Sequence, residues 1–342
     1  MAGDGYRVGV LGATGLVGTT ILELLASRGF PAAEVVPLAS ARSAGKEVEW
    51  NGETLTVREI GEDSIQGLDL VLSSAGGSVS AEWVPKIVAA GAVVVDNTSY
   101  FRMRDDVPLV VSEVNPEALD RHKGIVANPN CSTMQMVVAL KPLHDAAGIE
   151  RLVVSTYQAV SGTGKAAIDE LLEQSHAILH GQEATASIYP HQIPFNPLAQ
   201  AGSFADGDDH TDEERKLINE TRKILGDEEI EVSATCIRVP VVTGHSEAVN
   251  VQTREPLSAD RAREILAAAP GVTVVDDPAS SRFPMAIEAA GKDDVFVGRI
   301  REDASHASTL DIWVVADNLR KGAATNAVQI AELLVERNLL RT

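Results

Sequence analysis

The sequence lacks the hallmarks of several protein classes. Only 2 cysteines occur in 342 residues, and Cys131 and Cys236 fit neither a disulfide framework nor the spacing of a zinc site. No apolar run approaches the length that crosses a membrane, and the N-terminus has no basic segment followed by an apolar one. These absences predict a cytoplasmic chain that works in a reducing compartment, away from membranes.

Positive charge is also scarce. The chain has 29 Lys and Arg against 49 Asp and Glu, a formal net charge of -20. Nucleic acids and anionic membrane surfaces need a basic footprint, so neither is expected as a partner. An anionic small-molecule substrate would instead need arginine and lysine gathered at its site. The length suits two domains, and the hydrophobic and charged shares, 44% and 23%, are typical of a soluble globular protein.

A glycine-rich turn follows the first predicted strand. Residues 6–11 read as a buried strand that runs into Gly12 and Gly15, and a helical run over residues 19–26 comes next. Such a turn allows close backbone approach, and the helix start supplies amide donors for a pyrophosphate. Further strands are predicted at residues 34–39, 68–73, 92–96, 109–112 and 124–127. Because helices alternate with them, we expect a parallel, doubly wound sheet that binds a dinucleotide.

The end of the second predicted strand bears on the choice between NAD and NADP. An acidic residue there would bind the ribose hydroxyls, but the chain continues with Ser40, Ala41, Arg42 and Ser43. Hydroxyl groups and an arginine suit a 2′-phosphate. The expected cofactor is therefore NADP, with Arg42 at its phosphate; the alternative is a solvated loop arginine.

Cys131 lies where a predicted strand ends and an apolar helical run, residues 134–143, begins. Free amide groups and the positive end of the helix dipole favour a thiolate at such a position. Ser132 and Thr133 suit a first helical turn. Two interpretations stay open: a presented nucleophile, or a small hydrophobic side chain that fills a gap.

From residue 151 the pattern changes to long β-branched runs, typical of an α+β domain with a largely antiparallel sheet. The predicted strand at residues 232–242 contains Cys236, which we expect in the core, and Arg238, whose charge needs an anionic partner. His245 is predicted at a turn before a strand at residues 248–253. It is either a general base near the thiolate or a solvated turn residue.

The helices of this second half carry other candidate groups. A capping box at residues 211–214 predicts a helix on which Glu213 and Lys216 share a face, the usual arrangement of a surface ion pair. His176 and His180 are spaced as metal ligands, but nothing completes a set, so we expect no metal. Three prolines predict an irregular segment at residues 189–200, ordered against the body or a partner subunit. The amphipathic last helix should return to the first domain.

Several motifs together point to one family. They are Gly12-Ala13-Thr14-Gly15-Leu16-Val17-Gly18, Asn128-Pro129-Asn130-Cys131-Ser132-Thr133, Ser161-Gly162-Thr163-Gly164, Arg238-Val239-Pro240 with Gly244-His245-Ser246, and Asp317-Asn318-Leu319-Arg320-Lys321-Gly322-Ala323-Ala324. With these motifs the sequence resembles, essentially end to end, the aspartate-β-semialdehyde dehydrogenases. The resemblance implies an NADP-binding Rossmann domain over residues 1–130, completed by the helix at 323–342, and an α+β catalytic and dimerisation domain over 131–322. It also implies a homodimer or a dimer of dimers.

The resemblance also implies roles for individual residues. Cys131 would be the acyl-thioester nucleophile, His245 the acid/base and Gln158 the residue that positions the thiohemiacetal. The implied substrate contacts are Arg238 on the carboxylate, Glu213 on the amino group, Arg102 and Lys216 on the phosphate, and Asn130 nearby. The implied NADP contacts are Gly12, Thr14, Gly15, Leu16, Val17, Ser40, Ala41, Arg42, Ser43, Ser161, Gly162 and Asn318.

The implied reaction belongs to the biosynthesis of lysine, threonine and methionine. The Cys131 thiolate displaces phosphate from L-4-aspartyl phosphate, and the thioester is reduced with NADPH to L-aspartate-4-semialdehyde. N-acetyl-γ-glutamyl-phosphate reductase performs the same chemistry on a longer substrate, but its cysteine usually lies in a Pro-Gly-Cys-Tyr-like motif. An archaeal-type malonyl-CoA reductase is not excluded. A catalytically silent NADP-binding paralogue would be expected to have lost Cys131 or His245, and both are present.

Overall fold

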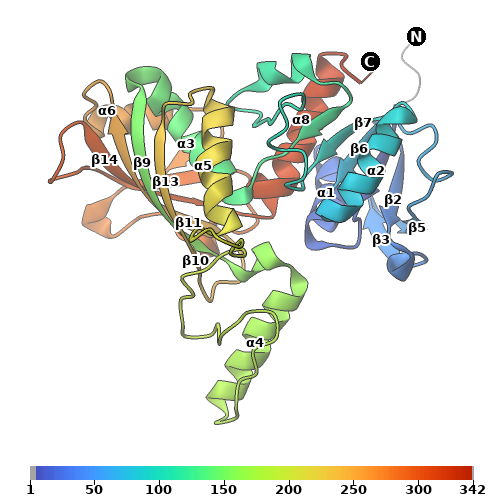
Figure 1. The fold of residues 1–342 in the computed structure, drawn as a ribbon, viewed down its shortest axis with the longest axis horizontal. Coiled ribbons are helices and arrows are strands. Elements are labelled where there is room, and N and C mark those ends of the chain that lie inside the picture. The colour runs from blue at the N-terminus through green and yellow to red at the C-terminus, as the bar shows by residue number, and fades with distance from the viewer. Residues whose placement is uncertain (1–4, 341–342) are drawn as a thin grey trace. The chain divides into compact units, whose positions relative to one another are not determined.

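The computed structural model describes residues 5–340. The chain divides into two compact units, one made of the residues up to Asn130 together with those from Ala323 onward, the other of Cys131–Gly322 (Figure 1). Among the described residues, no helix has both the length and the apolar composition needed to cross a membrane.

The first unit contains a six-stranded parallel sheet in the order β5-β2-β1-β6-β7-β8. Its strands are β1 (Tyr6–Leu11), β2 (Ala32–Ala39), β5 (Arg58–Glu59), β6 (Leu70–Ser73), β7 (Val93–Asp96) and β8 (Ile125–Ala127). Numbered among themselves in chain order, these six strands follow the 3-2-1-4-5-6 order of dinucleotide-binding sheets, which confirms the predicted doubly wound fold. The central strands are buried throughout, as parallel strands covered by helices must be.

Helices and a hairpin complete this unit. The helical elements are α1 (Leu16–Ser27), η1 (Ala41–Ser43), α2 (Gly77–Ala89), η2 (Pro116–Arg121) and α8 (Thr325–Glu336). The last helix, α8, packs against β6 and β7 beside α1. The hairpin consists of β3 (Glu47–Trp50) and β4 (Glu53–Thr56), which are joined by Asn51 and Gly52, with φ of 50° and 79° as this tight turn requires.

One predicted strand is wrong. Residues 109–112 contribute only a single bridge, from Leu109 to Ala127. The next backbone donor on the β8 side, the Ser112 N–H, donates instead to the Asn326 side chain at 3.0 Å. On the other side, the Asn115 side chain accepts from the Val111 N–H and donates to the Leu109 carbonyl, both at 2.9 Å. Side-chain bonds here replace strand pairing.

The second unit contains a mixed, mostly antiparallel sheet in the order β10-β9-β11-β14-β13-β12, as predicted. Its strands are β9 (Ile149–Gln158), β10 (Glu231–Arg238), β11 (His245–Thr253), β12 (Val272–Val274), β13 (Val295–Glu302) and β14 (Thr309–Ala316). Three helices cover one face: α3 (Cys131–Ala147), α5 (Asp212–Leu225) and α6 (Ala259–Ala267). The other elements are η3 (Val160–Thr163), α4 (Lys165–Leu179), η4 (Pro278–Ser280), α7 (Ala286–Ala289) and the π-helical turn η5 (Arg320–Ala324).

The irregular segment after α4 is ordered against the body of this unit. Leu198 exchanges two backbone hydrogen bonds of 2.8 Å with Arg238, and the Ala201 N–H donates to the Cys236 carbonyl at 2.9 Å. The segment thereby covers the free edge of β10, while α4 itself extends away from the sheet (Figure 1). Of the two predicted alternatives, order against the body is confirmed.

Candidate active site

Three predicted site residues share one row across the second sheet. β10 pairs with β9 so that Arg238 lies opposite Gln158. β11 pairs with β9 so that Ser246 lies opposite Tyr157, which places His245 opposite Gln158. Paired positions share a face of the sheet, and the three side chains are buried. The register therefore gathers an arginine, an amide and a histidine at one end of the strands.

His245 is fully buried at the first residue of β11, so the alternative of a solvated turn residue is wrong. Its Nδ1 accepts a hydrogen bond of 3.0 Å from the Ala159 N–H. The neutral ring therefore carries its proton on Nε2. Burial, and then the charge of Arg238, lower the pKa of His245 well below its ordinary value. Among the described residues Nε2 has no hydrogen-bond partner.

Arg238 is only 6% exposed. Its Nη1 donates to the Ala159 carbonyl at 2.7 Å, and its Nε has no hydrogen-bond partner within residues 5–340. The sequence predicted an anionic partner, but none of the described carboxylates pairs with this guanidinium. A buried charge needs compensation, so a carboxylate-bearing ligand fits here. One residue, Ala159, thus holds the histidine through its N–H and the arginine through its C=O.

Gly162 lies against both of these groups. A Cβ built on it would be 3.1 Å from Arg238 Nη1 and 3.3 Å from His245 Nε2. A larger residue would therefore press on the atoms that are available to a ligand. This close approach explains a glycine at a position where φ does not demand one.

Glu213 and Lys216 are confirmed as neighbours on α5, with Nζ to Oε2 at 3.2 Å. They are not the surface pair that the spacing predicted, because Glu213 is buried. Its Oε1 accepts from Gln158 Nε2 at 3.2 Å, which joins the pair to the row on the sheet. Burial lowers the pKa of Lys216, but the charges of Glu213 and Asp212 outweigh it and raise that pKa above its ordinary value.

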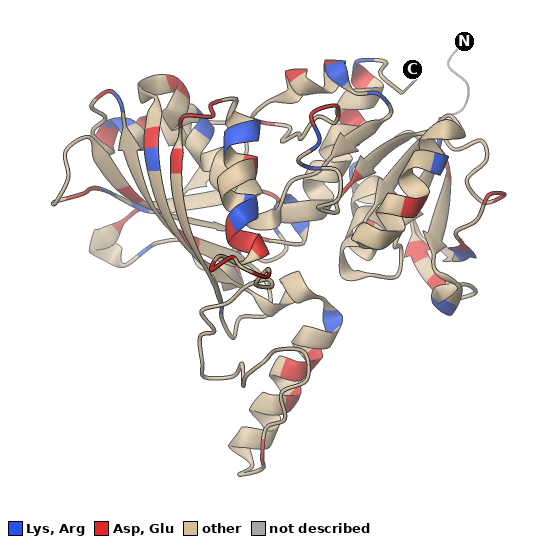
Figure 2. Ribbon diagram, viewed as in Figure 1, with Lys and Arg blue, Asp and Glu red and all other residues tan. Residues whose placement is uncertain are grey.

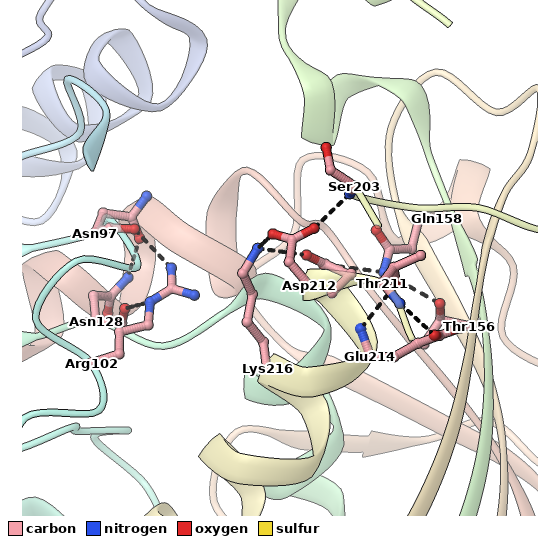
Figure 3. Close-up of polar contacts among 11 residues, drawn as sticks. Asn97, Arg102, Asn128, Thr156, Gln158, Ser203, Thr211, Asp212, Glu214 and Lys216 are labelled. Atoms are coloured by element: carbon pink, nitrogen blue, oxygen red, sulfur yellow. Dashed lines mark hydrogen bonds and ion pairs between the residues drawn. The ribbon is translucent and has the colours of Figure 1, made fainter. Parts of the chain in front are cut away.

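The capping box at the start of α5 positions these groups (Figure 3). The Thr211 hydroxyl accepts from the Glu214 N–H, and the Glu214 carboxylate accepts from the Thr211 N–H at 2.8 Å and the Cys236 N–H at 3.0 Å. The Glu214 carboxylate therefore connects the start of α5 to β10. Acidic residues fill its first turn and basic residues its last turn, as the helix dipole favours (Figure 2).

The two cysteines differ as predicted. Cys131 is the first residue of α3 and is partly exposed, whereas Cys236 is buried in β10. Burial raises the pKa of the Cys236 thiol, so this side chain is an inert part of the core. A Cβ on Gly322 would lie 3.0 Å from that of Cys131, so the start of α3 packs closely on the backbone of this glycine.

Asn318 connects two of the recognised motifs. It exchanges hydrogen bonds of 3.1 and 2.9 Å with the Ser161 hydroxyl, and its Oδ1 also accepts from the Gly244 N–H at 2.9 Å. The loop at Ser161 and Gly162 and the turn before His245 are therefore held together. Ser161, Gly162 and Asn318, the implied cofactor contacts of the second unit, therefore lie beside His245.

Arg102 belongs to the first unit and is also buried. Its Nε donates to the Asn128 carbonyl and its Nη2 to the Asn97 carbonyl, both at 2.9 Å (Figure 3). The Asn128 side chain is in turn bound by Asn97 and by Asn326 of α8, at 2.6 Å each. Asn130, buried, is the last residue of this unit before α3. The asparagine network therefore holds the guanidinium in place through two backbone carbonyls.

Only part of this network had a signal in the sequence. Asn97 and Asn128 directly follow buried parallel strands, a position that points to a ligand site. Asn326, in contrast, lies on a helix and shows no such signal. Its role depends on a contact that only the folded chain creates.

The cofactor residues of the first unit surround a cavity of about 480 Å³. The cavity lies where strand order reverses, between β1 and β6, the usual ligand position in such sheets. Of the predicted residues, those lining it are Gly12, Thr14, Gly15, Ser40, Ala41, Arg42 and Ser43. Leu16 and Val17 form the first turn of α1 and are not among the lining residues. Sequence analysis missed Glu59, Ser74 and Trp83.

The residues present fit a dinucleotide. Gly12 has a φ of +87°, and a Cβ there would meet the Ser74 backbone at 3.0 Å, so only glycine allows the turn. The start of α1 has no side-chain cap, which leaves its amides for a phosphate. Arg42 is exposed on the rim, but Glu59 also lines the cavity. A 2′-phosphate would meet both charges.

No described group of three or more His, Cys, Asp or Glu side chains could hold a metal ion. His176 and His180 instead stack, with ring centroids 4.2 Å apart. The His180 ring also bonds the His176 carbonyl at 2.8 Å.

Comparison with known proteins matches both units. The family models "Semialdehyde dehydrogenase, NAD binding domain" and "Semialdehyde dehydrogenase, dimerisation domain" match residues 7–122 and 140–321. The aspartate-semialdehyde dehydrogenase of Aquifex aeolicus (strain VF5) is 55% identical over 340 residues, which cover 98% of this chain and 100% of that protein.

Solved structures agree. Aspartate semialdehyde dehydrogenase II from Vibrio cholerae, complexed with ASA, is 50% identical with a TM-score of 0.93, over 97% of this chain and 98% of that one. The aspartate semialdehyde dehydrogenase with NADP from Candida albicans is 28% identical with a TM-score of 0.74, over 98% and 99% of the chains. Sequence and fold are thus similar along the full length, and the chain belongs to the aspartate-semialdehyde dehydrogenase family.

Proposed function

We propose that the chain is an NADP-dependent, phosphorylating aspartate-semialdehyde dehydrogenase that uses a cysteine thioester. The observation that carries this proposal is the buried row of Arg238, Gln158 and His245, in which Arg238 Nε and His245 Nε2 have no partner among the described residues. A buried cation and a buried N–H donor on one face suit a substrate with a carboxylate and a carbonyl. Relatives named aspartate-semialdehyde dehydrogenase support the same substrate.

The substrate groups are assigned by charge. Arg238 binds the α-carboxylate, because its planar fork can donate from Nε and a terminal nitrogen together. Glu213 binds the amino group, and Lys216 and Arg102 bind phosphate. Asn130 is a nearby contact. The backbone carbonyls of Asn128 and Asn97 orient the Arg102 guanidinium.

Cys131 forms and releases the acyl group. Its thiolate attacks the acyl carbon of L-4-aspartyl phosphate, the bond from that carbon to the phosphate oxygen breaks, and phosphate leaves with the electron pair. When bound, the nicotinamide supplies a hydride to the thioester carbon, or accepts one in the reverse direction. The resulting alkoxide collapses, the carbon–sulfur bond breaks and the thiolate is restored with release of the aldehyde.

His245 acts on the acyl oxygen from Nε2. Because Nδ1 accepts the Ala159 N–H, the neutral ring donates at Nε2 without first gaining a proton. Negative charge develops on the acyl oxygen in both tetrahedral intermediates, where a fixed donor in a buried site is most effective. Of the predicted acid and base roles, the geometry thus favours the one in which His245 donates a hydrogen bond or a proton. Gln158, held by Glu213, positions the same intermediates.

The 2′-phosphate of NADP is bound by the segment Ser40, Ala41, Arg42 and Ser43. The pyrophosphate is bound at the start of α1, by Gly12, Thr14 and Gly15. From the second unit, Ser161, Gly162 and Asn318 are further cofactor contacts. Support for NADP over NAD comes from the exposed Arg42 and from the NADP named in the Candida albicans structure. The Glu59 carboxylate lines the same cavity and would repel a 2′-phosphate, which weakens the preference for NADP over NAD.

The test is phosphate-dependent reduction of NADP with L-aspartate-4-semialdehyde, followed by absorbance of the reduced cofactor. Omitting phosphate should stop turnover, and replacing NADP with NAD should slow it. Turnover with N-acetylglutamate semialdehyde instead would move the assignment to the longer-substrate reductase. Absence of turnover with both aldehydes would refute the proposed activity.

The open face of the second sheet is the proposed contact with a second copy. The matched dimerisation-domain model covers these strands. Tyr157 and Trp313 pack on this face with ring centroids 5.5 Å apart, beside a hollow of about 680 Å³ that is also lined by Phe283 and Met285. Trp313→Arg should convert the dimer, or dimer of dimers, to monomers by light scattering. An unchanged mass would place the contact elsewhere.

A further inference from the structure

Glu247 is a carboxyl group buried directly beneath the proposed site. It follows His245 by two residues on β11 and therefore lies on the same face of the sheet. Thr156 and Val314 are its neighbours on the adjacent strands. The side chain is fully buried, and neither carboxyl oxygen has a hydrogen-bond partner among the described residues. An ionised carboxylate in this place would be very costly, so the group is neutral.

Gln135 is the matching group on the helix. It lies four residues after Cys131 on α3, on the same helix face. It is fully buried, and its Nε2 donates to the His245 carbonyl at 3.3 Å. Its Oε1 has no partner within the described chain. The Gln135 side chain interacts with Glu247 where α3 packs on β11. An acceptor without a donor thus lies beside a carboxyl group that, once neutral, has an O–H to donate.

We propose that Gln135 and Glu247 are positioning residues: the neutral Glu247 carboxyl donates to Gln135 Oε1, and the pair sets the spacing between α3, which carries Cys131, and β11, which carries His245. This inference rests on the proposed function, in which the Cys131 and His245 side chains act on one carbonyl group of the substrate. Gln135 lies one helical turn after Cys131, and Glu247 lies two residues after His245. The pair therefore connects α3 and β11 close to the reacting groups. A shift of about 1 Å between such groups can cost about 100-fold in rate.

The surroundings keep Glu247 neutral. Burial is the main reason that the pKa of Glu247 lies well above its ordinary value; the adjacent Gln135 amide offsets part of the rise, and the charge of Glu213 on α5 adds to it. The other titratable groups nearby are Cys236 on β10 and His245 on β11, both buried and uncharged. No cation among them would favour the ionised form.

The experiment compares Glu247→Gln, Glu247→Leu, Gln135→Leu and the double variant Gln135→Leu/Glu247→Leu. Glutamine keeps the shape and a donor toward Oε1, so Glu247→Gln should stay within about threefold of the parent kcat. Each single leucine variant should lower kcat by about tenfold or more with KM nearly unchanged, because substrate contacts remain. The double variant removes both side chains with unsatisfied oxygens and should regain thermal stability relative to the single leucine variants, while kcat stays low.

Two results would overturn the inference. Glu247→Leu that folds and keeps the parent kcat would show that the pair positions nothing. Glu247→Gln as impaired as Glu247→Leu would show that a carboxylate, not a neutral donor, is required. If a leucine variant fails to fold, Glu247→Gln and the double variant still decide between these outcomes.

A second readout separates this inference from the proposed function. The rate at which iodoacetamide alkylates Cys131, measured against pH, reports its thiolate without any turnover. The leucine variants should shift this profile and Glu247→Gln should not. Parent protein that turns over neither aldehyde would refute the proposed function, whereas unshifted alkylation in all variants would refute the positioning role alone.

Discussion

Replacing Arg238 with lysine keeps the positive charge but removes the planar fork. In the structure Nη1 is already occupied by the Ala159 carbonyl at 2.7 Å, and Nε is buried without a partner among the described residues. A lysine ammonium cannot hold the Ala159 carbonyl and present two further donors in that geometry. At least one charged hydrogen bond to the substrate carboxylate should therefore be lost.

The magnitude follows from that loss. A hydrogen bond to a charged group contributes about 1.5–3 kcal/mol, and each ~1.4 kcal/mol is tenfold in affinity. Arg238→Lys should thus raise KM for L-aspartate-4-semialdehyde roughly 10- to 100-fold. The KM for phosphate should change little, because Lys216 and Arg102 are assigned to that group. The fall in kcat should be smaller than the rise in KM.

The assay is initial-rate kinetics with the aldehyde varied at saturating NADP and phosphate. Arg261→Lys is the matched control, because Arg261 is exposed and pairs only with Glu264 at 2.7 Å among the described residues of the second unit. The control should keep both constants. An unchanged aldehyde KM in Arg238→Lys would refute the carboxylate assignment, and an equal rise in phosphate KM would show general damage to the site.

Three other predictions concern the nucleophile, the cofactor and pH. Cys131→Ser should lose nearly all turnover yet still bind NADPH by fluorescence titration; substantial residual turnover would remove Cys131 from the mechanism. Arg42→Ala should lower kcat/KM for NADP more than for NAD, and Glu59→Gln should raise kcat/KM for NADP. Equal effects on kcat/KM for both cofactors would place the 2′-phosphate elsewhere. The unfolded chain loses the Glu247 proton near its ordinary pKa of 4.5, whereas burial makes the folded protein keep it to a higher pH. The parent should therefore lose up to about 1.4 kcal/mol of stability per pH unit, relative to Glu247→Gln, as pH rises above that value; a difference in urea unfolding that is flat with pH would show that Glu247 ionises in the fold.

The strand boundaries show where sequence analysis succeeds and fails. β1 was predicted at its observed bounds because the glycine-rich turn that starts at Gly12 marks its end. β11 was predicted to begin at Ala248, but it begins at His245. The inward positions 245 and 247 carry His and Glu, so the residues that make the site also break the apolar alternation. Glu247 was missed for this reason.

Other parts of the site depend on contacts that a single sequence does not contain. Cys131 was recognisable because a strand end and a helix start meet there. Gln135 lies within an apolar helical run, and only the packing of α3 on β11 gives its amide a partner. Asn326 becomes part of the Arg102 network only because α8 returns to the first unit. Polar residues inside packed elements have no local signal.

The Ala159 backbone offers a physical account of substrate length. In the proposed enzyme its N–H orients the oxyanion donor, His245, and its C=O orients the carboxylate clamp, Arg238. The spacing between the two ends of the substrate is therefore a property of one peptide segment and of the sheet register, not of two flexible side chains. Gly162 closes the space beside both groups, where even a Cβ would lie 3.1 Å from Arg238 Nη1. A longer, acylated substrate would have to displace backbone rather than a side chain, and packed backbone resists such a shift.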